Sequence, residues 1–159
     1  MRIVVISDTH LETPEQLPSK ILEEMERSDL TIHCGDYVEI GILSFLRERF
    51  SFEGVRGNMD APEICSQVPE KRILDLAGKK VGIIHGWGSP FHLAKRVLER
   101  FPPLDLILFG HSHVPFQESY GPTLLFNPGT LSSFALKLKK TYGIIEMDPM
   151  GMRASILST

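Results

Sequence analysis

Short apolar runs alternate with stretches of helical pattern along this chain of 159 residues, and this alternation constrains its fold more than any other feature. The runs are rich in Val, Ile, Leu and Phe, and each stops abruptly at a Gly or a polar residue. Strands are expected at 2–6, 30–34, 50–55, 72–76, 79–84 and 104–109, and helices around Ile21 to Met25, at 40–49 and from Pro90 to about Phe101. This order predicts an α/β protein.

The last third of the chain has a different pattern. Strands are expected at 116–119, 124–126, 142–147 and 154–157, with no long helix between them, so this part is predicted to be a mostly antiparallel sheet. The sequence has no internal repeat and no convincing linker, and its length suits one ordinary domain. We therefore expect a single domain over residues 1–159.

Composition narrows the classes of protein that fit. The formal net charge is -3 without a block of like charges, so no nucleic-acid polymer or anionic membrane is expected as a partner. No apolar run approaches the roughly 20 residues of a membrane span. Cys34 and Cys65 have neither disulfide nor metal-site spacing, and we expect free thiols in a cytoplasmic protein.

Five of the apolar runs end in side chains that can bind a metal ion. These endings carry Asp8 and His10, Asp36, Asn58, His85, and His111 with His113. Loops beyond the carboxyl ends of strands in an open α/β sheet are where ligands bind, so the five endings are expected to meet at one rim.

The chemistry of these endings favours a pair of ions. Two carboxylates, one amide oxygen and four imidazoles, without a thiolate, suit a first-row divalent ion such as Mn²⁺, Fe²⁺, Co²⁺, Ni²⁺ or Zn²⁺. Seven side chains are too many for one ion. They suit two ions about 3.5–4 Å apart with a bridging carboxylate, an arrangement that serves in-line displacement at phosphorus.

The ordered motifs resemble those of the calcineurin-like metallophosphoesterases, including their small bacterial and archaeal phosphodiesterases. The family pattern of D-x-H, G-D, G-N, a lone His and G-H-x-H is matched in order, with a further landmark at 127–130. The matching positions are Asp8-Thr9-His10, Gly35-Asp36, Gly57-Asn58, His85 and Gly110-His111-Ser112-His113. The resemblance spans the whole chain and implies a four-layer α/β/β/α sandwich of two facing mixed sheets flanked by helices.

The resemblance also implies roles for these residues. Asp8, His10 and His113 would hold one metal, Asn58, His85 and His111 the other, and Asp36 would bridge them, with Asp36, Asn58 and His111 counted as catalytic. The implied cofactors are two divalent ions, with Mn or Ni favoured over Fe, Co or Zn. A hydroxide bridging the ions would attack the phosphorus of a small phosphoester.

One position departs from the pattern. Met59 follows Asn58, where many relatives acting on monoesters carry a histidine that can protonate the leaving group. A thioether cannot act as a general acid, so good leaving groups and hence phosphodiesters are favoured, and the general acid is left unidentified. Asp60 is expected to fix the loop through backbone hydrogen bonds.

Four further residues could have either a role in the site or a purely structural role. His33 lies inside a predicted buried strand and is expected to be a hydrogen-bonded core residue. Trp87 is either part of the substrate rim or a packed surface aromatic. His92 fits a solvated helical histidine better than a site residue. Arg56 suits either substrate phosphate or a neighbouring carboxylate.

Two alternative functions stay open beside the phosphodiesterase. The same centre would serve a phosphomonoesterase or pyrophosphatase, and Met59 argues against that only moderately. The family also contains a subunit of a eukaryotic membrane-trafficking coat that uses this fold as a protein-binding scaffold. The seven intact ligand positions favour the enzyme. A small phosphoester is the expected partner, and a homo-oligomer is left open.

Overall fold

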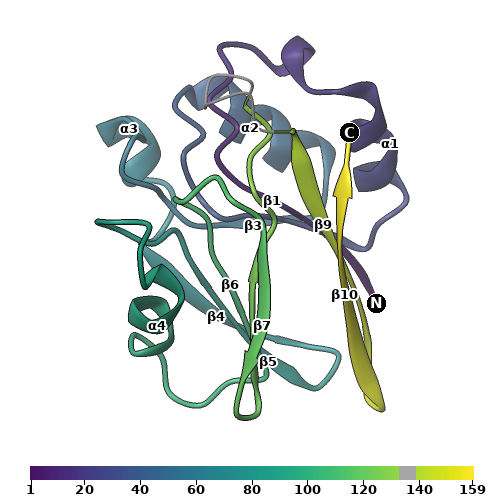
Figure 1. Cartoon of the computed structure of the whole chain (residues 1–159). Coiled ribbons are helices and arrows are strands. Elements are labelled where there is room, and N and C mark those ends of the chain that lie inside the picture. Colours follow the sequence, from purple (N-terminus) through teal and green to yellow (C-terminus); the bar gives the residue numbers. More distant parts are fainter. Residues whose placement is uncertain (133–138) are drawn as a thin grey trace.

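Two five-stranded sheets are stacked face to face in the computed structural model, which describes residues 1–132 and 139–159 (Figure 1). The first sheet has the order β10-β9-β1-β2-β3. Its strands are β1 (Arg2–Ile6), β2 (Leu30–His33), β3 (Phe52–Gly54), β9 (Thr141–Asp148) and β10 (Gly151–Ser158). The pairs β1·β2 and β2·β3 are parallel, whereas β9 runs antiparallel to β1 and β10.

The second sheet has the order β4-β5-β6-β8-β7 and is also mixed. Its strands are β4 (Lys71–Leu76), β5 (Lys79–Ile84), β6 (Leu106–Leu108), β7 (Phe116–Tyr120) and β8 (Thr123–Asn127). The pairs β5·β6 and β6·β8 are parallel, and β4·β5 and β7·β8 are antiparallel hairpins.

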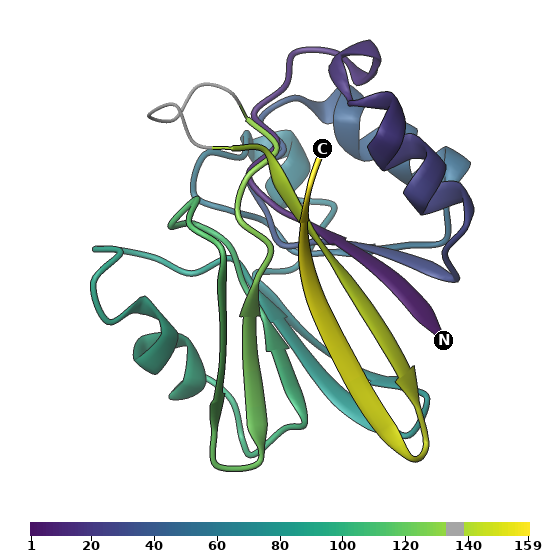
Figure 2. The same ribbon diagram turned by 45° about the vertical axis from the view of Figure 1, so that its right-hand side comes forward.

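Helices cover the outer faces of both sheets (Figure 2). On the first sheet lie α1 (Ser19–Glu26) and α2 (Ile40–Arg49), and on the second lies α4 (Leu93–Leu98). Two short elements, η1 (Pro14–Gln16) and α3 (Pro62–Cys65), sit in the connections. The expected α/β/β/α sandwich of two facing mixed sheets is confirmed.

Three buried clusters fill the spaces between the four layers. Strand β1 contributes to two of these clusters, because successive side chains of a strand point to opposite faces of the sheet. Ile3 and Val5 join the cluster between the sheets, while Val4 and Ile6 pack towards α1 and α2. The third cluster, which includes Val97, lies between α4 and the second sheet. Since both faces of β1 are buried, its sequence is a continuous apolar run and not an alternating one.

The structure corrects three expectations. The strands of the last third do not form one sheet: β7 and β8 belong to the second sheet and β9 and β10 to the first, and β8 pairs parallel with β6. The helix expected from Pro90 begins at Leu93, because His92 has φ 58° and interrupts a right-handed helix. The strand expected at 50–55 is shorter, and η1 and α3 were not expected.

The interface between the sheets generates a stability prediction. Ile32 on β2 is fully buried in the inter-sheet cluster, so Ile32→Ala should lower the free energy of unfolding by about 2–5 kcal/mol through lost burial and a cavity. Ile73 on β4 is 46% exposed, and Ile73→Ala should cost under about 1 kcal/mol. Urea unfolding of both variants measures the difference, and equal losses would contradict this packing.

Candidate metal centre

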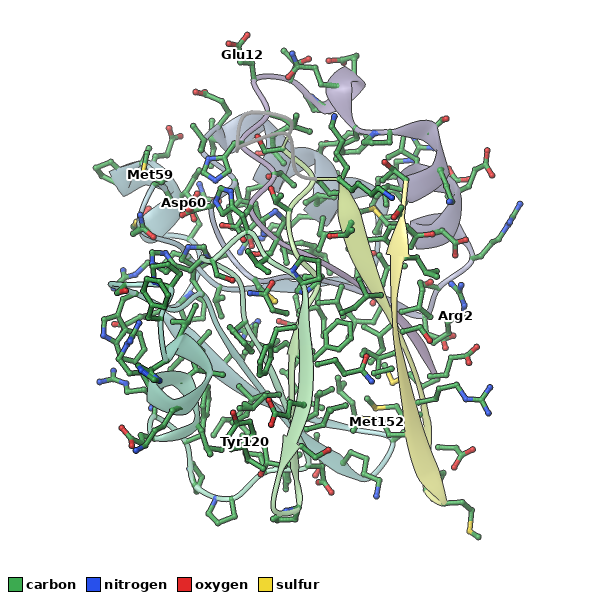
Figure 3. The ribbon with its side chains drawn as sticks, in the orientation of Figure 1. Arg2, Glu12, Met59, Asp60, Tyr120 and Met152 are labelled. Atoms are coloured by element: carbon green, nitrogen blue, oxygen red, sulfur yellow. The ribbon has the colours of Figure 1, made fainter. Side chains whose placement is uncertain are left out.

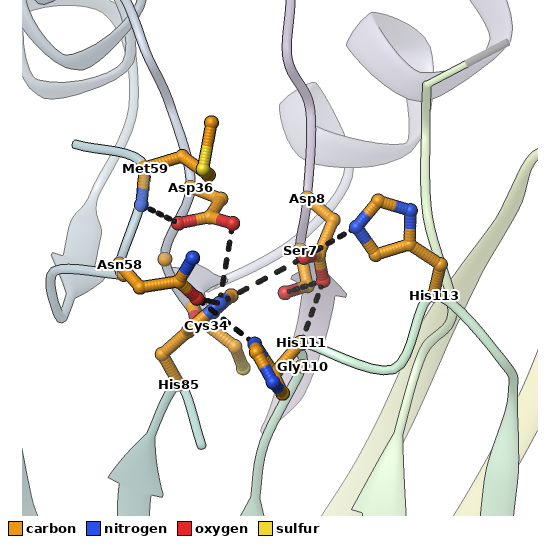
Figure 4. Close-up of polar contacts among 12 residues, drawn as sticks. Ser7, Asp8, Cys34, Asp36, Asn58, Met59, His85, Gly110, His111 and His113 are labelled. Carbon is orange, nitrogen blue, oxygen red and sulfur yellow. Dashed lines mark hydrogen bonds and ion pairs between the residues drawn. The ribbon is translucent and has the colours of Figure 1, made fainter. Parts of the chain in front are cut away.

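The seven side chains singled out in the sequence lie at the rim where both sheets end, and all of them except His10 are labelled in Figure 4. Asp8 and His10 follow β1, Asp36 follows β2 and Asn58 follows β3, all in the first sheet. His85 follows β5, and His111 and His113 follow β6, in the second sheet. The expected convergence is therefore present, but the rim belongs to two facing sheets and not to one.

Four of the seven residues form one compact group. Candidate ligand atoms of Asp8, His10, Asp36 and His113 all lie within 4.8 Å of one another. His10 Nε2 lies 3.6 Å from Asp36 Oδ2 and 3.9 Å from Asp8 Oδ1, and His113 Nε2 lies 3.2 Å from Asp8 Oδ1. Nitrogen and oxygen donors at these separations can hold a first-row divalent ion.

The other three residues form a second group that also contacts Asp36. His85 Nε2 lies 3.3 Å from Asp36 Oδ2 and 3.2 Å from Asn58 Oδ1. Asn58 Oδ1 in turn lies 2.9 Å from His111 Nδ1. Asp36 Oδ2 thus lies close to both His10 and His85, so this one oxygen belongs to both groups.

Backbone carbonyl groups set the orientation of two of the imidazoles. His85 Nδ1 lies 2.8 Å from the Cys34 carbonyl oxygen, and His111 Nε2 lies 2.7 Å from that of Gly88. A carbonyl oxygen only accepts, so these nitrogens carry the ring protons, and a neutral ring then presents a bare nitrogen on its other side. When the rings are neutral, both bare nitrogens face the Asn58 oxygen, at 3.2 Å for His85 and 2.9 Å for His111, and a cation between these acceptors would stabilise them.

Each carboxylate accepts backbone or hydroxyl hydrogen bonds through one oxygen, and its other oxygen faces the imidazoles. Asp8 Oδ2 accepts hydrogen bonds from Ser7 Oγ (2.5 Å) and the His111 amide (3.1 Å), and Asp36 Oδ1 accepts one from the Met59 amide (2.8 Å). Asp8 Oδ1 and His10 Nε2 are buried and take part in no hydrogen bond. Buried polar atoms are seldom left so, and these two fit a bound divalent ion.

Unusual backbone conformations aim these side chains. Five of the seven residues have positive φ: Asp8 (51°), His10 (44°), Asp36 (60°), His111 (68°) and His113 (59°). Left-handed conformations are uncommon outside glycine and collect at functional sites, where the surrounding structure holds them. Gly57 leaves the space that Asp36 requires, since a Cβ at residue 57 would lie 2.0 Å from Asp36 Oδ1.

The charges of the cluster shift the pKa values of its members. Burial opposes ionisation of Asp36, but the hydrogen bond from His85 and nearby positive charge outweigh it and lower the pKa of Asp36. Burial likewise opposes the charged form of His85, yet its hydrogen bond to Asp36 and the charge of Asp8 raise the pKa of His85. The Asp8 carboxylate, whose Oδ1 lies 3.2 Å from His113 Nε2, raises the pKa of His113, while burial lowers that of His10.

Comparison with known proteins identifies the family of this chain. The family model of the calcineurin-like phosphoesterase superfamily domain matches residues 1–150. The chain belongs to that superfamily. A protein of Methanocaldococcus jannaschii named as a probable metallophosphoesterase is 37% identical over 134 residues, which are 82% of this chain and 68% of that protein. A phosphodiesterase of the same organism is 26% identical over 99% of both chains.

Solved structures show the same architecture. A Thermotoga maritima protein, 34% identical and with 99% of both chains covered, has a TM-score of 0.76. Vps29 of Chaetomium thermophilum has a TM-score of 0.79 over 100% of this chain and 97% of that one, but it is only 14% identical. At that identity the likeness concerns the fold alone. No helix within residues 1–132 and 139–159 is long and apolar enough to cross a membrane.

Two residues around the phosphoesterase centre behave as the sequence predicted. His33 is fully buried: its Nδ1 accepts a hydrogen bond from the Gly35 amide (3.0 Å), and burial lowers its pKa to about 3, so it is a neutral core histidine. Asp60 accepts hydrogen bonds from the backbone amides of Asp36, Val38 and Gly57 at 2.7–3.1 Å and so fixes the loops that carry Asp36 and Asn58.

The structure bears on the two roles that the sequence left open for Arg56 and for Trp87. Arg56 lies 3.8 Å from a Glu70 carboxylate oxygen, which fits the pairing with a neighbouring carboxylate. Trp87 is 39% exposed, with the Arg100 guanidinium 5.3 Å from its ring centre. Both residues line a cavity of about 180 Å³ together with Asn58 and His85. Trp87 is therefore at once a surface aromatic and part of the rim.

The landmark at 127–130 has a structural role that the sequence pattern alone did not reveal. Asn127 donates hydrogen bonds to the Gly110 carbonyl (2.8 Å) and to Ser112 Oγ (3.1 Å), and Thr130 donates one to the Asp8 carbonyl (2.7 Å). These buried side chains support the two loops that carry Asp8 and His111, and outer contacts of this kind orient ligands.

The raised pKa values of His85 and His113 predict that metal binding releases protons. Near pH 6.5 both imidazoles hold more proton than a free histidine does, and an ion must displace it, so affinity should fall as the pH falls through this range. Titration calorimetry with Mn²⁺ in two buffers of different ionisation enthalpy measures the release, which should be larger at pH 6.5 than at pH 8.5. Identical enthalpies in both buffers at pH 6.5 would contradict the prediction.

Proposed function

We propose that this protein is a two-metal phosphoesterase that hydrolyses small phosphodiesters. The observation that carries the proposal is the position of Asp36 Oδ2, which lies 3.6 Å from His10 Nε2 and 3.3 Å from His85 Nε2. A carboxylate between two sets of nitrogen donors is suited to bridge two ions. Asp8, His10 and His113 would complete one position, and Asn58, His85 and His111 the other.

The donor spacing suits a pair of ions of first-row type. Two ligands bound at right angles to one ion at about 2.1 Å lie about 3 Å apart, and Asn58 Oδ1 and His111 Nδ1 are separated by 2.9 Å. Oxygen and imidazole donors favour Mn²⁺ or Ni²⁺ here, with Fe, Co or Zn also compatible. Bound divalent ions supply Lewis acidity and lower the pKa of water enough for it to attack phosphorus near neutral pH.

The residues next to the centre favour a diester with a good leaving group. Met59 and Asp60 lie close together in Figure 3. Met59, whose amide bonds to Asp36, is 58% exposed and offers no proton, and both Asp60 oxygens already accept amide hydrogen bonds. Neither residue can therefore protonate a departing alcohol. A substrate that needs no such help is the better match, which supports the phosphodiesterase over the phosphomonoesterase.

Comparison of two esters tests the substrate class. The metal is removed, Mn²⁺ or Ni²⁺ is added back, metal content is measured, and hydrolysis of bis(p-nitrophenyl) phosphate is compared with that of p-nitrophenyl phosphate. We expect metal-dependent hydrolysis with the diester preferred. Preference for the monoester would show that the phosphomonoesterase is correct. A fully metallated protein inactive on both esters would favour the protein-binding scaffold.

Replacement of the bridging carboxylate tests the centre itself. Asp36→Asn should lower turnover by at least about 100-fold and weaken metal binding, because an amide cannot neutralise charge between two ions. The fold should persist, as judged by circular dichroism. Asp75→Asn, which changes an exposed aspartate of β4, is the matched control and should behave as the wild type. Full activity of Asp36→Asn would defeat the assignment.

A further inference from the structure

The two imidazoles that face Asn58 are oriented in different ways. The carbonyl group that fixes His85 belongs to Cys34, a buried residue whose own amide bonds to the Ile6 carbonyl at 2.9 Å. The carbonyl group that fixes His111 belongs to Gly88, which lies in the exposed loop of residues 86–92 between β5 and α4. A well-defined position for the Gly88 carbonyl therefore needs support from outside the sheet.

Arg96 on α4 supplies that support. Its Nη2 donates to the carbonyls of Trp87 (3.0 Å) and Ser89, and its Nη1 donates to the Phe91 carbonyl (2.7 Å). One guanidinium thus holds three carbonyls of the loop, and two of them flank Gly88. With those two turned towards Arg96, the Gly88 carbonyl points to His111.

The loop has little stiffness of its own. Gly86 and Gly88 have φ values of 106° and 74°, conformations that glycine adopts readily, and flexible glycine lowers the cost of alternative loop shapes. A planar guanidinium with five donors is suited to bind several carbonyl oxygens in a fixed arrangement. Lysine would offer the same charge without the planar fork.

We propose that Arg96 is a positioning residue for the metal centre: by holding the 86–92 loop, it places the Gly88 carbonyl so that His111 keeps its proton on Nε2 and presents Nδ1. The inference rests on the proposed function, in which His111 Nδ1 is a ligand of the second ion. Arg96 touches neither the ions nor the substrate. Its effect passes through one backbone carbonyl to one ring.

The matched pair of variants is Arg96→Gln and Lys95→Gln. Both remove one positive charge from adjacent positions of α4, but the Lys95 side chain makes no hydrogen bond or ion pair that the structure records among its described residues. Arg96→Gln should weaken binding of one of the two metal equivalents by about 10- to 100-fold, the usual effect of losing an outer contact to a ligand. The other equivalent should bind as in the wild type, and Lys95→Gln should bind both normally.

Arg96→Lys separates charge from geometry. It keeps the positive charge but cannot hold three carbonyls in one plane, so we expect an intermediate loss for the same single equivalent. Titration calorimetry of the full chain with Mn²⁺ gives the two affinities, and circular dichroism verifies folding. Wild-type affinities in both Arg96 variants would overturn the proposal.

Nitrogen-15 spectra of the histidine rings provide a readout apart from activity and affinity. In the full wild-type chain, with Zn²⁺ bound and after its removal, His111 should carry its proton on Nε2. A proton on Nδ1 would overturn the proposal without recourse to any variant. In Arg96→Gln after Zn²⁺ removal, the His111 signals should shift towards a mixture of tautomers, whereas those of His85 should not.

His111→Ala distinguishes failure of this inference from failure of the proposed function. Loss of one metal equivalent in His111→Ala but not in the Arg96 variants would reject only the positioning role. Binding of two equivalents by His111→Ala as in the wild type would reject the metal centre itself. Selective loss in both His111→Ala and Arg96→Gln supports the two proposals together.

Discussion

Two carboxylates buried at the edge of two sheets are the constraint on which the rest of the structure depends. Asp8 is 0% and Asp36 2% exposed, and a buried charge without compensation costs several kcal/mol. Among the described residues, every ion pair of these two carboxylates is with a histidine and none is with a lysine or arginine. The hydroxyl of Ser7 and two backbone amides compensate part of this cost, and positive charge has to come from protons on imidazoles or from bound cations. The raised pKa values of His85 and His113 are consistent with protons on imidazoles.

The same carboxylates join the two sheets. Asp8 follows a strand of the first sheet, and its Oδ2 accepts a hydrogen bond from the amide of His111, which follows a strand of the second. Asp36 likewise belongs to the first sheet and meets His85 of the second at 3.3 Å. At the rim the same contacts hold the two sheets together and place the charged side chains of the site. These contacts hold the backbone in place, which explains why five residues there keep positive φ values.

Much of this arrangement could be predicted from the sequence. Buried strands are continuous apolar runs, and polar side chains directly after them are confined to the rim by the end of each run, so the gathering of Asp8, Asp36 and His85 follows from local pattern. The hydrogen bonds of Asp60 were predictable because a carboxylate that closely follows a Gly-Asn turn meets free amides there. The sheet to which each strand belongs could not be predicted from the sequence. Strand β8 pairs parallel with β6, while β7, which precedes β8 in the sequence, lies at the edge of the sheet. Such pairing is set by tertiary packing and leaves no trace in periodicity.

The conformation of the loops could not be predicted from the sequence either, and it matters more for function than the sheets do. Pro90 favoured a helix start, yet His92 adopts a left-handed conformation and α4 begins at Leu93. This shorter helix leaves residues 86–92 as a loop within reach of Arg96, an arrangement that no short motif signals. The four-layer fold is shared with Vps29 of Chaetomium thermophilum at a TM-score of 0.79 and 14% identity, so the sheets alone do not specify chemistry. Specificity of function has to reside in the side chains and loop carbonyls at the rim, where a single guanidinium can determine which nitrogen of an imidazole faces the site.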